Sequence, residues 1–172
     1  MTKNMYNLLC GILASTVFLT LAGCGGGGDS NYIPPTVYTS AVAKVKLNGE
    51  LAGKAISGAE FTMTLPANVT PASATGFVTP TGTFAGSTIA PIVTYIPASG
   101  PTPGTVHVVV SSSVEAGVAT AGEVATVMLH LANGATPTAP SFSFDSVATT
   151  VIDTLGNPIT GMTASVAGVT LQ

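Results

Sequence analysis

The stretch ISGAEFTMTL, residues 56–65, decides the fold class of this chain. Its apolar residues Phe61, Met63 and Leu65 recur at every second position, with a threonine between each pair. Successive side chains of a β-strand point to opposite faces of its sheet. The spacing therefore predicts a strand with one buried and one exposed face.

The same period recurs further along the chain. Val106 and Val108 alternate with Thr105 and His107, and residues 124–131 are apolar on one face and mixed on the other. Further strands are predicted at residues 42–47, 89–96, 141–144, 149–153 and 162–171. Turn residues separate these runs at Asn48-Gly49, 100–104, Asn133-Gly134 and 155–158. Many short strands with such turns are typical of an all-β sandwich or barrel, and the length favours an antiparallel β-sandwich.

Composition indicates one folded domain at residues 41–172. Hydrophobic residues make up 46% of the 172 residues and charged residues only 6%, so the chain can bury a core despite its low charge. Residues 24–40 contain four consecutive glycines and a Pro-Pro step, which predicts a flexible linker with a stiffer end.

The first 23 residues have the pattern of an export signal. Lys3 precedes an apolar run at residues 8–21, which is too short to cross a bilayer as a helix. The run ends in Leu21-Ala22-Gly23-Cys24, which resembles the lipobox of bacterial lipoproteins. The resemblance implies cleavage before Cys24, a diacylglyceryl thioether on its sulfur and an acyl chain on its new amino group.

Such a modification would anchor the protein to a lipid bilayer, since more than one acyl chain gives stable attachment. Cys10 would leave with the signal, so the mature chain would have no free thiol and no disulfide. Residue 25 is glycine and not aspartate. By resemblance to lipoprotein sorting in enteric bacteria, this favours the outer membrane over the inner membrane within the cell envelope.

Three segments of the predicted sandwich resemble a cohesin-type domain, a jelly-roll sandwich related to bacterial carbohydrate-binding modules. They are an early strand at residues 58–65 with the proline-marked turn at 66–69, the strand GEVATVML at 122–129, and the closing hairpin at 153–166. The resemblance implies that one sheet face binds a dockerin, a small calcium-loaded protein. Cohesin recognition faces usually carry several acids, and acids are sparse here.

The sequence lacks the patterns typical of nucleic-acid binding, metal binding and catalysis. After residue 24 the chain has three lysines against seven acids and no arginine, which argues against nucleic acid as a partner. The two histidines, His107 and His130, lie on separate predicted strands, and we expect no metal site, cofactor or catalytic residue. Asp153-x-Leu155-x-Asn157 lacks the remaining ligands of a calcium loop and is better explained by a hairpin turn.

Aromatic side chains could stack on sugar rings, but the chain has no tryptophan. Phe61, Phe142 and Phe144 fit strand patterns and are expected in the core, which leaves Tyr95, with Phe77 or Phe84, as glycan contacts. We therefore expect a non-catalytic, membrane-anchored module that contacts a dockerin-like or other envelope protein. A carbohydrate-binding module that takes a polysaccharide, and a structural surface lipoprotein, stay as alternatives.

Overall fold

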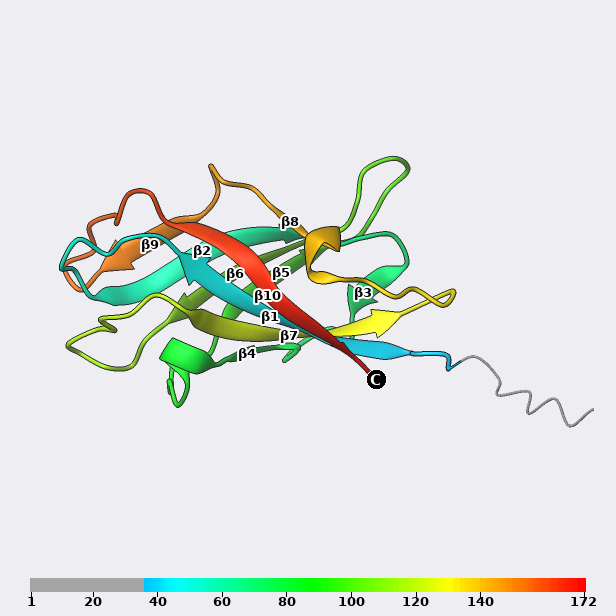
Figure 1. Cartoon of the computed structure of the whole chain (residues 1–172), viewed down its shortest axis with the longest axis horizontal. Coiled ribbons are helices and arrows are strands. Elements are labelled where there is room, and N and C mark those ends of the chain that lie inside the picture. Colours follow the sequence, from blue (N-terminus) through cyan, green and yellow to red (C-terminus); the bar gives the residue numbers. More distant parts are fainter. Residues whose placement is uncertain (1–35) are drawn as a thin grey trace, which may run out of the picture. The chain divides into compact units, whose positions relative to one another are not determined.

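A computed structural model of the chain describes residues 36–172 (Figure 1). The predicted signal peptide, the lipobox, Cys24 and most of the predicted linker lie outside this part. The strands are β1 (Ser40–Asn48), β2 (Ile56–Thr64), β3 (Val69–Pro71), β4 (Val78–Pro80), β5 (Ile92–Ile96), β6 (Thr105–Ser111), β7 (Glu123–Leu131), β8 (Ser143–Phe144), β9 (Thr150–Asp153) and β10 (Thr163–Leu171). Two short 3-10 turns are η1 (Gly82–Phe84) and η2 (Ala139–Ser141).

The strands form two antiparallel sheets, as predicted. Sheet A has the order β10-β1-β7-β3, with β4 also paired to β7. Sheet B has the order β5-β6-β2-β8, with β9 also paired to β2. This arrangement is consistent with a jelly roll. Within residues 36–172, no helix has the length and apolarity that crossing a membrane requires.

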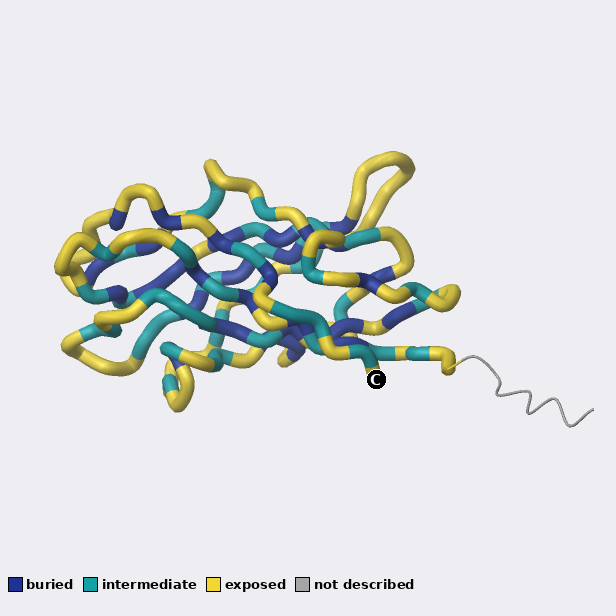
Figure 2. The backbone as a smooth tube through the Cα atoms, viewed as in Figure 1, coloured by how far each residue is buried: buried dark blue, intermediate teal, exposed yellow. Residues whose placement is uncertain are grey.

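The core lies between the two sheets and follows the two-residue period of the sequence. Ala59, Phe61 and Met63 of β2 are buried. Between them, Glu60 is exposed and Thr62 is half-buried. Figure 2 shows buried positions along the strands and exposed positions mainly in the loops. The largest fully buried side chains are Leu47, Ile56, Phe61, Met63, Leu65, Phe84 and Leu129.

Two short strands were not predicted. β3 and β4 have three residues each, and both end in a proline. Each pairs with a different part of β7, so together they form an interrupted edge of sheet A. Three residues are too few for a period to be recognised in the sequence, and proline lacks the N–H that would continue a ladder.

The tight turn predicted at Asp153 is confirmed, because the chain folds back from Ile152 to Pro158. The predicted closing hairpin over residues 153–166 is wrong, because β9 pairs with β2 in sheet B and β10 pairs with β1 in sheet A. One carboxylate oxygen of Asp153 accepts hydrogen bonds from the backbone N–H groups of Asn157 (2.8 Å) and Leu155 (3.0 Å). Its other oxygen lies 3.2 Å from the Lys54 ammonium. Gly156 has a φ of 80°, which suits glycine. The carboxylate therefore organises the turn between β9 and β10.

Candidate functional site

The outer side of sheet B is an open surface, which we call the sheet B face. The strand registers place its residues in rows, such as Thr150, Glu60, Val109 and Ile92 across four strands. The sheet B face consists of Glu60, Thr62 and Thr64 of β2, Ile92, Thr94 and Ile96 of β5, Thr105, His107, Val109 and Ser111 of β6, and Thr150 and Ile152 of β9. All of them are exposed or half-buried.

One polar pair lies near the middle of the sheet B face. The Nε2 atom of His107 is 2.7 Å from Oε1 of Glu60, on the neighbouring strand. The side chains are 35% and 49% exposed, respectively. A pair so open to water contributes little to stability. It does offer a donor and an acceptor to any partner that covers this face.

A shallow hollow of about 80 Å³ lies beside this pair. It forms at Gly58, because a Cβ atom at that position would lie 3.4 Å from the Ser111 hydroxyl and 3.6 Å from the Ile152 side chain. Glu60, Val109 and Thr150 also line the hollow. The sheet B face is thus apolar at Val109 and Ile152 and polar at its centre. The hollow at Gly58 lies next to the apolar residues and to Glu60.

The outer side of sheet A has a different character. Lys44 of β1 lies 3.4 Å from Glu123 of β7, and the side chain of Asn48 donates a hydrogen bond to the Ser165 hydroxyl of β10 at 3.0 Å. This side carries the charged residues Lys44, Lys46 and Glu123, whereas the sheet B face has one acid, Glu60, beside His107. Charged residues are depleted in the centres of protein interfaces, so sheet B offers the better contact surface.

Tyr95, the predicted glycan contact, lines a cleft of about 280 Å³ at one end of the sandwich. The walls of the cleft are residues 65–70 and residues 98–104, which join β2 to β3 and β5 to β6. Tyr95 is half-buried and packs partly against the core. Asn68, Thr70 and Thr102 add polar groups.

The prediction that Phe77 or Phe84 contacts a glycan is wrong. Phe77 and Phe84 are 2% and 1% exposed and belong to the core, so neither can stack on a sugar. Phe84 enters the core from the short turn η1, which carries no strand period. The expectation that Phe61 and Phe142 are core residues is confirmed, and Phe144 packs against the core with its ring 6.0 Å from that of Phe61.

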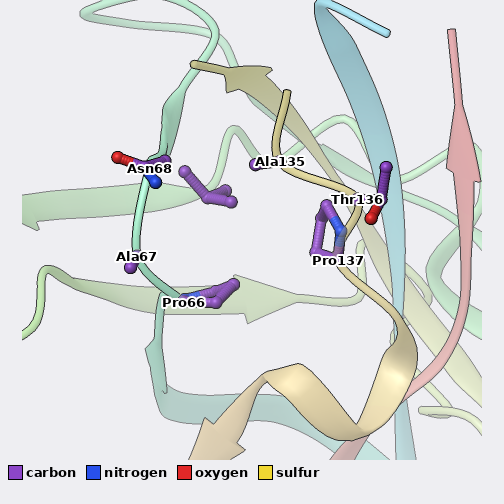
Figure 3. Close-up of a pocket in the computed structure, with 7 residues that line it drawn as sticks. Pro66, Ala67, Asn68, Ala135, Thr136 and Pro137 are labelled. Carbon is purple, nitrogen blue, oxygen red and sulfur yellow. The ribbon is translucent and has the colours of Figure 1, made fainter. Parts of the chain in front are cut away.

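A second cleft of about 280 Å³ shares residues 66–69 with the Tyr95 cleft (Figure 3). Figure 3 shows this segment across the cleft from Ala135, Thr136 and Pro137. The side chain of Asn133 donates to that of Asn68 at 3.1 Å. This bond joins the loop after β7 to the loop after β2.

The two histidines lie on different sheets. His107 belongs to β6 of sheet B, and His130 belongs to β7 of sheet A. Within residues 36–172, no group of three or more His, Cys, Asp or Glu side chains is placed to hold a metal ion.

Comparison with known protein families, with characterised proteins and with solved structures finds no match to this chain. The geometry of its own surfaces is therefore the basis for assigning a function. Those surfaces are the sheet B face, the Tyr95 cleft and the neighbouring cleft of Figure 3.

Proposed function

We propose that the protein is a membrane-anchored, non-catalytic module that binds another protein of the cell envelope through the sheet B face. The observation that carries the proposal is the composition of this face. Ile92 and Ile96 are 67% and 59% exposed, and Val109 and Ile152 are half-buried around a central polar pair. Apolar side chains gathered on an open sheet are typical of surfaces that a partner covers.

The anchor supports the same proposal. The lipobox resemblance at residues 21–24 implies attachment to a bilayer, and the sequence up to residue 40 is rich in glycine, serine and proline. A tethered partner meets its target at a raised effective concentration, so even a modest interface can act. A dockerin-like protein fits this role through the cohesin resemblance.

The interface test compares two matched substitutions in the full chain. Val109→Lys places an ammonium group in the sheet B face, and Val42→Lys makes the same change at a half-buried position on the outer side of sheet A. Capture of envelope proteins should be lost with Val109→Lys and kept with Val42→Lys. Equal capture by both, or no specific partner with and without calcium, would rule the proposal out.

The anchor test uses the two cysteines of the chain. Metabolic labelling with a palmitate analogue should disappear in Cys24→Ser and persist in Cys10→Ser, because only Cys24 follows the lipobox residues. Labelling that survives Cys24→Ser would contradict the anchor.

Glycan binding is the second candidate, and the cleft beside Tyr95 favours it. An aromatic ring with Asn and Thr side chains is the kind of lining that holds a sugar. Co-sedimentation with polysaccharides should be lost in Tyr95→Ala and kept in Tyr95→Phe, which retains the ring. Retention of no polysaccharide from a broad panel would remove this candidate. Failure of both binding tests would leave a structural surface lipoprotein.

A further inference from the structure

The edge strand β5 has free backbone groups that can be assigned from the register. Ser112 donates to the Ser57 carbonyl and Leu65 to the Gly104 carbonyl, both at 2.8 Å. These bonds show that even-numbered positions of β6 face β2, so odd-numbered positions face β5. The odd positions pair with Ile92, Thr94 and Ile96. The N–H and C=O groups of Val93 and Tyr95 therefore point away from the sheet.

Within residues 36–172, no other group forms a hydrogen bond with these four outward groups. Pro91 and Pro97 occupy the next positions in the same phase, and neither has an N–H. Along this edge, the free N–H and C=O groups thus belong to Val93 and Tyr95, and a proline lies in the same phase on each side of them. The edge also carries no charge, and charge is a common means of preventing edge pairing.

We propose that β5 pairs with β5 of a second copy of this chain, antiparallel about a two-fold axis at Thr94. In this register Val93 of each copy lies opposite Tyr95 of the other, and all four outward groups are paired. A shift by two residues would place Pro91 or Pro97 opposite a free carbonyl and leave that carbonyl unpaired.

The side chains fit the same register. Ile92 of one copy lies beside Ile96 of the other, and the two-fold axis repeats this contact on its other side. The two most exposed apolar residues of β5 therefore pack against each other at two places. The pairing is isologous and uses the edge of both copies, so it closes at a dimer. It would also join the two sheet B faces into one surface, although it does not depend on the function proposed above.

The test places one cysteine on the two-fold axis. Residues opposite each other in a pair without hydrogen bonds have Cα atoms about 4.5 Å apart, close enough for a disulfide. Thr94→Cys is introduced into the full chain with Cys10→Ser and Cys24→Ser, purified in detergent, and oxidised. Thr150→Cys in the same background is the control, since Thr150 is an exposed threonine on another outer strand of sheet B.

Thr94→Cys should form a disulfide dimer at least about tenfold faster than Thr150→Cys. Equal rates, no dimer, or cross-links to a foreign protein instead would overturn the proposal. A second pair of variants checks the register: Thr94→Lys and Thr94→Glu should each abolish the dimer by like-charge repulsion, and mixing them should restore it. Because Cys24 is absent from the cysteine background and Val109 is unchanged, failure here is distinct from failure of the anchor or of partner capture.

Discussion

Among residues 36–172, Asp153 is the only buried charged residue, and its ionised form is held by hydrogen bonds. The backbone N–H of Asn157 contributes most to lowering the pKa of Asp153 from its ordinary value of 3.8, and burial opposes this effect. The Lys54 side chain and the Leu155 N–H lower the pKa further. The carboxylate is thus stabilised more in the folded state than in the unfolded state.

We predict that Asp153→Asn lowers the thermal midpoint at neutral pH and weakens its dependence on acid. A group with a lowered folded pKa stabilises the fold above its unfolded pKa, and this stabilisation is lost as pH falls through the folded value. Melting curves from pH 7 to pH 2 measure both effects. Asp145→Asn, in an exposed turn, is the control; an equal effect there would contradict the assignment.

Substitutions at two glycines distinguish the energetic cost of steric overlap from that of backbone strain. Gly82 and Gly86 have φ angles of 56° and 76°, but only at Gly82 would a Cβ atom overlap the Glu123 carbonyl oxygen. We predict that Gly86→Ala costs about 1 kcal/mol of unfolding free energy. Gly82→Ala should cost about 1–3 kcal/mol more, because the chain around η1 must shift. Denaturant titration measures both, and equal losses would contradict the overlap.

At the scale of elements, η1 enters the core through Phe84, and the Thr83 hydroxyl donates a hydrogen bond to the Glu123 carbonyl at 3.0 Å. Phe84 is buried, whereas the remaining residues of this turn, Gly82 and Thr83, are exposed or half-buried. We predict that Phe84→Ala lowers the unfolding free energy by about 3–5 kcal/mol, as for other buried phenylalanines. Leu155→Ala is the control, since Leu155 is 84% exposed and should leave stability nearly unchanged. A small loss for Phe84→Ala would contradict the contribution assigned to the buried ring.

The longer strands could be predicted because burial alternates along them. Val106 and Val108 of β6 are buried and His107 between them is not, which is the pattern read from the sequence. The strand predicted at residues 89–96 is shorter at its start, where Pro91 precedes Ile92 and cannot donate to a ladder. η2 likewise replaces the start of the strand predicted at residues 141–144.

The candidate site was harder to predict than the strands. The clefts depend on which loops lie side by side at one end of the sandwich. That placement follows from the order of the strands in the sheets, and no local sequence pattern reveals strand order. The sheet B face left a partial signal: Val109 interrupts the polar phase of β6 set by Thr105 and His107. An apolar residue in an outward position marks a contact surface only once the neighbouring strands are known.

At the scale of the whole molecule, the two sheets are held together without covalent cross-links. Residues 36–172 contain no cysteine, and the buried side chains between the sheets are nearly all apolar. We predict that a reducing agent leaves the thermal midpoint of the full chain unchanged. The comparison is made by circular dichroism with and without dithiothreitol, and a midpoint that falls on reduction would contradict a fold held by packing alone.

The position of β1 has a mechanical consequence. This strand lies between β10 and β7, and the Thr39 N–H just before it also donates to the Gln172 carbonyl. A force applied through the chain before Ser40 therefore loads two hydrogen-bonded ladders at once, where an edge strand would load only one. The fold thus resists extraction by a pull from that side.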